Sequence, residues 1–198
     1  MFITLEGGEG AGKSTQARLL ADALAAAGRP VLLTREPGGA PGAEALRAML
    51  LGGAHRWSAA AEAHLHFAAR AEHLVRSILP ALAAGMVVVC DRFADSTLAY
   101  QGYGQGADRA LIRGLTALLP RQPDRTLMLR VDAAVAAGRM QARRQRLDRY
   151  ESMDAAFHAR VAAGFAAIAA AEPGRCRVLD ADGDVDAVHR AIMAAVAA

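Results

Sequence analysis

The sequence predicts a three-layer α/β fold, in which helices cover both faces of a five-stranded parallel sheet. Two observations predict it. Short apolar runs alternate with segments of helical periodicity along the whole chain. The first apolar run leads directly into a glycine-rich segment of the form G-x-x-x-x-G-K-[ST], so the class is a P-loop NTPase-type fold. With 198 residues and no visible repeat or linker, we expect a single domain over residues 1–198.

Five apolar runs are expected to form the strands of the sheet. They span residues 1–5, 30–34, 86–90, 126–131 and 175–179. The run at 86–90, Met-Val-Val-Val-Cys, is continuously apolar and predicts a central strand buried on both faces. Because ligands bind beyond the carboxyl ends of such strands, we expect the segments that follow the first four strands to form one site.

Helices are expected between the strands and after the last one. They span residues 14–27, 43–51, 59–79, 107–118, 133–146, 152–171 and 184–197, and residues 81–84 follow the third of them. Pro80 is expected to end the long helix that begins at Ala59. A loop covers residues 52–58, and a loop with the start of a helix covers residues 93–101. The glycine-rich segment 102–106 is interpreted as a flexible connection.

The composition limits the class of protein. A net charge of +3 does not by itself indicate a nucleic-acid partner. The apolar runs are too short to span a bilayer, and no signal-peptide pattern is visible at the start of the sequence. Cys90 and Cys176 lie in or beside apolar strand-like runs, which predicts buried thiols rather than a disulfide or metal site. We therefore expect a cytoplasmic protein without a membrane partner.

The segment Gly7–Ser14 has the chemistry of a phosphate-binding loop. Its glycines allow successive backbone N–H groups to curl round a polyphosphate. The next helix directs its positive N-terminus to the same anion. Lys13, the only lysine in the chain, is expected to reach the β- and γ-phosphates, and Ser14 to hold Mg²⁺. Asp91, at the end of strand 86–90, is expected to order Mg²⁺ directly or through water; the alternative is a strand-end turn.

Arginines gather in two groups. Arg35, Arg47, Arg70 and Arg92 are expected to converge on a second phosphate, although any one alone could be a solvated surface charge. Segment 139–151 is rich in arginine and is interpreted as a short lid that closes over a transferring phosphate. The alternatives for this segment are a solvated helix face and a nucleic-acid patch.

Several segments, in the same order along the chain, closely resemble bacterial thymidylate kinases. They are Thr34–Gly39 (Thr-Arg-Glu-Pro-Gly-Gly), Phe67–Arg70, Asp91–Phe93, Ser96–Gly102 and Leu147–Glu151. The resemblance covers essentially the whole chain. It implies phosphoryl transfer from ATP·Mg²⁺ to deoxythymidine monophosphate (dTMP), giving the diphosphate dTDP. It also implies a five-stranded parallel P-loop kinase fold and a homodimer, with no nucleic-acid partner.

The resemblance also implies a set of site residues. The ATP-binding residues are Gly7, Gly8, Glu9, Gly10, Ala11, Gly12, Lys13, Ser14 and Thr15. The dTMP-binding residues are Glu36, Arg47, His66, Phe67, Arg70, Arg92, Ser96, Thr97, Tyr100 and Gln101. The catalytic residues are Lys13, Asp91, Arg92, Arg144 and Arg149, and the Mg²⁺ residues are Ser14 and Asp91.

Individual roles follow from the matched motifs. Arg70 would bond the O4 edge of thymine and Thr97 would face N3, while Tyr100 would lie against the sugar and disfavour a 2′-hydroxyl. Arg92 and Arg47 would bind the acceptor phosphate. Glu36 and Asp91 would lie near the metal and phosphates. Arg144 would support transfer from the lid, because Glu9 stands where other members carry a P-loop arginine.

The sequence departs from the family pattern at two positions. The thymine-stacking phenylalanine often lies four residues before the matching arginine, where this chain has His66, and Phe67 lies three before it. Either ring could stack on thymine. The lid arginine expected near adenine falls on Met140, with Arg139 beside it.

Competing functions are less well supported. Another nucleotide or small-molecule kinase would not be expected to combine Arg70, Thr97 and Tyr100. A P-loop GTPase is disfavoured because no Asn-Lys-x-Asp segment is present. A nucleic-acid-binding ATPase would use the basic segment 139–149 on a polymer.

Overall fold

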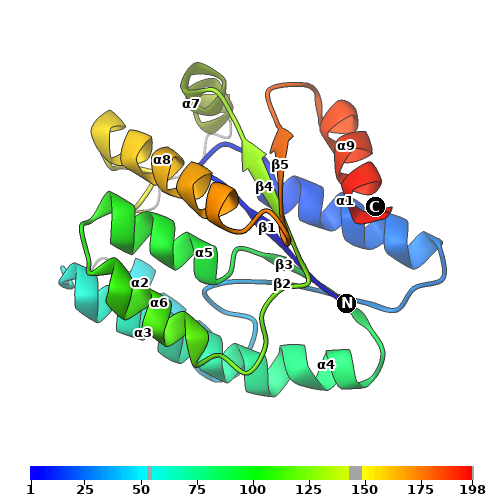
Figure 1. The fold of residues 1–198 in the computed structure, drawn as a ribbon, viewed down its shortest axis with the longest axis horizontal. Coiled ribbons are helices and arrows are strands. Elements are labelled where there is room, and N and C mark those ends of the chain that lie inside the picture. Colours follow the sequence, from blue (N-terminus) through cyan, green and yellow to red (C-terminus); the bar gives the residue numbers. More distant parts are fainter. Residues whose placement is uncertain (53–54, 143–148, 198) are drawn as a thin grey trace.

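The computed structural model describes residues 1–52, 55–142 and 149–197 and confirms the predicted fold class. Within these residues, five parallel strands form one sheet in the order β2-β3-β1-β4-β5 (Figure 1). The strands are β1 (Phe2–Glu6), β2 (Val31–Arg35), β3 (Val87–Asp91), β4 (Arg125–Arg130) and β5 (Cys176–Asp180). Each strand boundary lies within one residue of its predicted position.

Helices cover both faces of this sheet. They are α1 (Lys13–Ala26), α2 (Pro41–Leu51), α3 (Ala59–His73), α4 (Leu79–Ala83), α5 (Ala94–Thr97), α6 (Arg109–Ala117), α7 (Ala133–Ala142), α8 (Ala155–Ala171) and α9 (Val185–Ala197). Two π-helical segments, η1 (Leu74–Ile78) and η2 (Leu98–Gly104), join α3 to α4 and continue α5. Figure 1 shows α1 and α9 on one side of the sheet and α4, α5 and α8 on the other.

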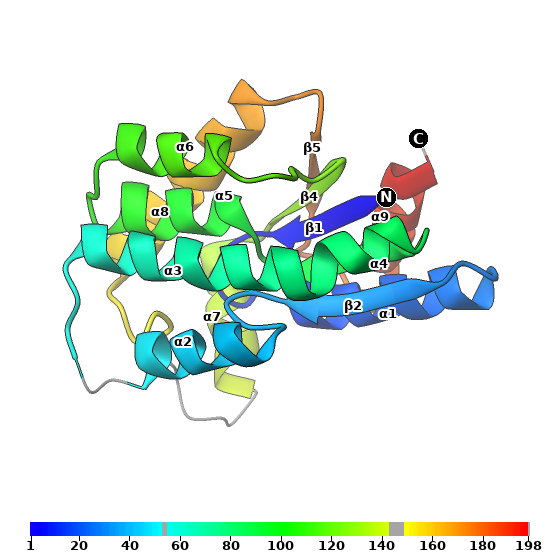
Figure 2. The ribbon, with the colours of Figure 1, turned by 90° about the horizontal axis from the view of Figure 1, so that it is seen from below.

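The two faces of β1 lead to two separate parts of the core. Ile3 and Leu5 are fully buried and pack with residues of α1 and α9. Phe2 points the other way and packs with Leu74 and Ile78. This alternation is expected of a strand covered on both faces. On the second face, α2 runs alongside α3 (Figure 2).

The prediction that Pro80 ends the long helix is wrong. Pro80 lies in the first turn of α4, and the helical path continues through η1. Proline is tolerated in this continuous helical path because the π-helical turn before it already interrupts the regular i→i−4 ladder, to which a proline cannot donate. The π-helical turn shifts the hydrogen-bond pattern to i→i+5 just before the proline.

The prediction that residues 102–106 form a flexible connection is also wrong for their first part. Gly102 and Gly104 are buried and belong to η2. A Cβ on Gly104 would lie 2.6 Å from Cε2 of Phe157 in α8. These glycines therefore serve close packing of helical backbone rather than chain mobility.

Cys90 and Cys176 are free and buried, as predicted. Burial raises the pKa of Cys90 well above its ordinary value and that of Cys176 to about 11. Among the described ranges, no helix combines the length and apolar character needed to cross a membrane.

Candidate active site

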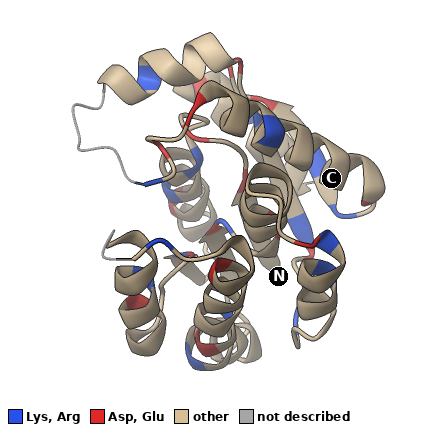
Figure 3. Cartoon of the chain, turned by 90° about the vertical axis from the view of Figure 1, so that its left-hand side faces the viewer, with Lys and Arg blue, Asp and Glu red and all other residues tan. Residues whose placement is uncertain are grey.

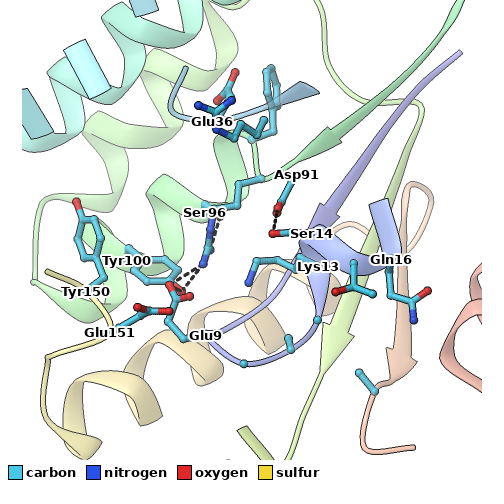
Figure 4. A pocket seen from close by; sticks show the side chains of 18 of the residues that line it. Glu9, Lys13, Ser14, Gln16, Glu36, Asp91, Ser96, Tyr100, Tyr150 and Glu151 are labelled. Atoms are coloured by element: carbon cyan, nitrogen blue, oxygen red, sulfur yellow. Dashed lines mark hydrogen bonds and ion pairs between the residues drawn. The ribbon is translucent and has the colours of Figure 1, made fainter. Parts of the chain in front are cut away.

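A cavity of about 780 Å³ lies at the carboxyl end of the sheet. Residues that follow β1, β2, β3 and β5 line it, as do residues of α3, α5, η2 and α7. The prediction that the loops after the first three strands share one site is confirmed. The fourth strand contributes through Arg139 on α7, and the loop after β5 contributes residues that were not predicted. Figure 4 shows Lys13 and Ser14 between Gln16 on one side and Tyr100 and Tyr150 on the other.

The loop after β1 depends on glycine at defined positions. Gly7, Gly10 and Gly12 have φ values of 143°, 72° and 85°, which favour residues without a Cβ. A Cβ on Gly7 would lie 2.4 Å from the carbonyl oxygen of Leu129, and one on Gly10 would lie 2.6 Å from that of Ala136. Gly12 caps α1, so the helix N-terminus and the loop amides face the same space.

Lys13 and Ser14 begin α1 beneath this loop. The Nζ of Lys13 donates a hydrogen bond to the carbonyl oxygen of Gly8 at 2.6 Å. Burial, and then the nearby charge of Arg92, lower the pKa of Lys13 to about 8, although Glu9 and Asp91 oppose the shift. The Oγ of Ser14 donates to Oδ2 of Asp91 at 2.5 Å.

The Ser14–Asp91 pair fits a hard divalent cation. Oδ1 of Asp91 is buried and makes no hydrogen bond to any described residue. A hydroxyl and a carboxylate with one unpartnered oxygen are ligands that Mg²⁺ accepts, with water completing the shell. Ser14 itself is exposed to the cavity.

Arg92 links the loop after β3 to the phosphate loop. Its φ of 70° is unusual for a residue with a side chain, and its backbone N–H donates to the carbonyl oxygen of Leu5 in β1 at 2.9 Å. Its Nη2 donates to Oε1 of Glu9 at 2.6 Å and to Oη of Tyr100 at 3.1 Å, and Tyr100 in turn donates to Glu9 at 2.8 Å. Burial opposes the charge of Arg92, but Glu9 and Tyr100 outweigh it and raise its pKa.

The predicted base-reading residues, Arg70 and Thr97, are joined by a hydrogen bond. Nε of Arg70 donates to Oε2 of Glu36 at 2.7 Å, and its Nη2 donates to Oγ1 of Thr97 at 3.2 Å. The guanidinium lies 4.7 Å from the ring centre of Phe67 and 5.1 Å from that of Phe93. Nη1 is buried without a hydrogen-bond partner among the described residues. The two N–H groups of Nη1 therefore remain for a ligand acceptor.

His66 and Phe67 differ in position. His66 lines the cavity, whereas Phe67 packs with Ala63, Ala107 and Ile112. The Nε2 of His66 lies 3.2 Å from the hydroxyl of Tyr150. Burial, and then the positive charges led by Arg70, lower the pKa of His66 to about 3, so the ring is neutral.

The other predicted acceptor-site residues also line the cavity but differ in their bonds. Arg47 donates to the carbonyl oxygen of Pro37 at 2.7 Å. Arg35 is half exposed and pairs with Glu44. Ser96 donates to a buried carboxylate of Glu6 at 2.5 Å. Gln101 donates to the hydroxyl of Tyr150 at 3.0 Å.

The predicted lid is described only at its two ends. Arg139 donates to carbonyl oxygens of Gly10, Ala181, Asp182 and Gly183. Arg149 donates to Glu62, a fully buried carboxylate on α3. Arg144 lies outside the described residues. Figure 3 shows basic and acidic positions interspersed on the same elements. Arg139 and Arg149 both bond to other parts of the protein rather than forming a solvated face.

Sequence reasoning missed four residues in or behind this site: Glu6, Gln16, Glu62 and His73. Glu6, Glu62 and His73 are fully buried and hold predicted residues through hydrogen bonds or ion pairs. Burial and nearby Asp95 raise the pKa of Glu6 to about 8, despite its bonds to Ser96 and Phe93. Gln16 and Arg139 line the end of the cavity that is formed by the loop after β5, which we call the far end. The acidic, glycine-containing turn 180–184 at the end of β5 was a signal for that end.

Gln16 fixes one wall of this far end. Its Nε2 donates to the carbonyl oxygen of Val185 at 2.8 Å. Its Oε1 is buried and has no partner among the described residues. Arg139, rather than Met140, lines the cavity here.

Comparison with known proteins agrees with this geometry. Residues 5–192 match the family model described as thymidylate kinase. The chain is 56% identical to the thymidylate kinase of Gluconobacter oxydans, over 99% of this chain and 94% of the relative. It is 54% identical to that of Caulobacter vibrioides, over 96% and 93%. The crystal structure of thymidylate kinase from Ehrlichia chaffeensis aligns with a TM-score of 0.81 and 38% identity, over 100% of this chain and 98% of that one. The chain therefore belongs to the thymidylate kinase family of nucleotide kinases.

Proposed function

We propose that this chain transfers the γ-phosphoryl group of ATP to dTMP, giving dTDP and ADP, with Mg²⁺ as the metal. The observation that carries the proposal is the continuous cavity, which is lined both by the phosphate loop and by Arg70, whose Nη1 has no hydrogen-bond partner among the described residues. A nucleoside triphosphate at the loop and a pyrimidine at Arg70 would direct their phosphates toward the space between them.

The donor binds by its phosphates. The backbone N–H groups of residues 7–14 would hold them, and Lys13 would exchange its bond to Gly8 for the β- and γ-phosphates. Gln16 and the loop after β5 would receive the donor base. Ser14 and Asp91 would hold Mg²⁺, which neutralises phosphate charge when it is bound.

The acceptor phosphate needs no strong general base. A phosphate monoester has a second pKa of about 6, so it is largely dianionic at neutral pH. The obstacle is the repulsion between two anions that must meet in line. Arg92 and Arg47 would bind the acceptor phosphate, and Lys13 would stabilise the transferring group. Glu9 orients Arg92 and Tyr100, which border the place of the sugar.

Base selection belongs to α3 and α5. Nη1 of Arg70 would donate to O4 of thymine, and Thr97 would face N3. The neutral ring of His66 would stack on the base, because His66 and not Phe67 borders the cavity. Ser96, Gln101 and Glu36 complete the wall of this end.

Other features remain predictions from the sequence. The lid arginines Arg144 and Arg149 would stabilise the transferring phosphoryl group. The chain would act as one kinase domain over residues 1–198, as a homodimer in the cytoplasm, without nucleic-acid or membrane partners. The runner-up function is a kinase for another nucleoside monophosphate, which the same cavity would also accommodate.

A coupled ADP-release assay tests the proposal. ATP and Mg²⁺ are supplied with dTMP, dUMP, dCMP or dGMP as acceptor. We expect a strong preference for dTMP. Turnover with another acceptor, or hydrolysis of ATP that needs no acceptor, would contradict the substrate assignment while leaving the fold and family intact.

A further inference from the structure

The guanidinium of Arg70 stands at the end of a chain of hydrogen bonds that begins on β2. Oγ1 of Thr34 lies 2.8 Å from Nε2 of His73. Nδ1 of His73 lies 3.1 Å from Oε1 of Glu36, and the other oxygen of Glu36 accepts from Nε of Arg70 at 2.7 Å. Arg70 then reaches Thr97. Both oxygens of Glu36 are thus bound by protein side chains.

Burial makes this chain of bonds rigid. His73 is fully buried, and Arg70 and Glu36 are only 2% and 5% exposed. Arg70 and His73 lie three residues apart on α3, so they share one face of the helix. In this position a lost bond cannot be replaced by water without rearrangement, which makes each contact costly to remove.

Donors and acceptors can be assigned along this chain of bonds. A carboxylate only accepts, so Glu36 accepts from Nε of Arg70 and from Nδ1 of His73. The other ring nitrogen of His73, Nε2, bonds to the hydroxyl of Thr34. Every group in the chain is then satisfied except Nη1 of Arg70.

Gly39 locks the ring of His73 in place. A Cβ on Gly39 would lie 2.3 Å from Nε2 of His73 and 2.5 Å from Oγ1 of Thr34. The hydroxyl of Ser77 donates to the carbonyl oxygen of Gly39 at 2.7 Å and holds this backbone against the ring. Gly39 is therefore needed, because a residue without a Cβ lets the backbone pass this close to His73 and Thr34.

We propose that His73 is a positioning residue for selection of the acceptor base. It holds Glu36, which holds Arg70 so that Nη1 presents its N–H groups to a carbonyl on the base. A 4-oxo pyrimidine supplies that acceptor, whereas a 4-amino pyrimidine places its own donors there. This role rests on the proposed function. It assigns Glu36 to orientation of Arg70 rather than to contact with phosphate or metal.

Three variants remove the chain of bonds in steps. Thr34→Val removes one hydroxyl. His73→Asn keeps an N–H donor near the place of Nδ1, and His73→Leu removes both ring nitrogens. Leu74→Ala is the matched control, because Leu74 is the next residue, is fully buried and packs with Phe2 and Ile78. Each variant is assayed for kcat and KM with dTMP and dCMP, for KM with ATP, for Tm, and by calorimetric titration with dTMP alone.

We expect His73→Leu to raise the KM and Kd for dTMP about 10-fold or more, and to lower the dTMP-to-dCMP ratio of kcat/KM by a similar factor. The KM for ATP stays within about twofold. His73→Asn recovers most of the loss. Thr34→Val raises the KM and Kd for dTMP about 2- to 5-fold. Leu74→Ala lowers Tm without changing the acceptor ratio.

Two results would overturn the proposal. One is an unchanged acceptor ratio in His73→Leu, or in Thr34→Val if His73→Leu does not fold. The other is an equal change of ratio in Leu74→Ala at a matched loss of Tm. Failure of the proposed function is recognised separately, because the unsubstituted enzyme would then show no preference for dTMP.

Discussion

The donor end of the cavity is built mainly from backbone, and the acceptor end mainly from side chains. At the donor end, glycines with positive φ bring amides and carbonyls of residues 7–14 into the cavity. At the acceptor end, Arg70, Arg92 and Tyr100 are held by carboxylates from distant parts of the chain. Figure 4 shows Tyr100 beside Glu9. The phosphate loop is thus a local motif, whereas the acceptor end depends on long-range contacts.

Loss of Lys13 gives the largest expected effect, because it is the one side-chain cation in the backbone-built phosphate loop. We expect Lys13→Ala to lower kcat by roughly 10³-fold, the upper range for loss of one transition-state donor. Its Tm stays equal or rises, since Lys13 is a buried cation close to Arg92. Steady-state kinetics and calorimetry check both. Arg18→Ala, at an exposed position of α1, is the control and keeps full activity.

Loss of Arg144 is expected to have the next largest effect. Arg144→Ala should lower kcat by roughly 10²-fold or more, the scale of arginine-finger effects, with little change in the KM of either substrate. Single-turnover kinetics separate the transfer step from product release. Arg143→Ala, its neighbour, serves as control. An unchanged kcat in Arg144→Ala would remove this residue from the mechanism. The phosphate loop would then stabilise the transferring group without a lid arginine.

The phosphate loop at the donor end, being local, was the part best predicted from the sequence. The strand boundaries and the Gly7–Ser14 loop follow from patterns within a few residues, and the structure has them where they were expected. The supports of the acceptor end were not predicted. Glu36 and His73 lie 37 positions apart, and Glu62 and Arg149 lie 87 apart. No local periodicity indicates such a pair, because only the tertiary fold brings its members together.

Glycine shows the same limit of local reasoning. Gly10 and Gly104 are alike in sequence context, since each lies between other glycines one or two residues away. Gly10 is needed for its positive φ and for its closeness to Ala136. Gly104 is needed for its closeness to Phe157, a residue whose position depends on the packing of α8 against η2. The first role follows from a loop motif, whereas the second cannot be inferred before the helices are placed.

The pH dependence of ATP binding is a smaller effect that tests the donor end. Lys13 in the free enzyme has a pKa of about 8, below its ordinary 10.5, because it is buried and lies near Arg92. A bound triphosphate favours the charged amine and raises that pKa. Above pH 8, ATP binding should therefore take up a proton and weaken as pH rises. Calorimetric titration in buffers of different ionisation enthalpy measures the uptake, and none at pH 9 would contradict the assignment of Lys13.

The smallest expected effect distinguishes the two rings at the acceptor end. His66 borders the cavity and Phe67 packs into the core. We expect His66→Ala to raise the KM for dTMP about 5- to 10-fold, the low end of base–aromatic stacking, and His66→Phe to restore it. Phe67→Ala should instead lower Tm, with a smaller effect on dTMP affinity. Since the pKa of His66 is about 3, the ring stays neutral and contributes no pH dependence to dTMP binding between pH 5 and 9.

A loss of dTMP affinity in Phe67→Ala at unchanged Tm would reverse the assignment. The base would then stack on Phe67, and the acceptor end would open onto a face of α3 that packs against Ile112.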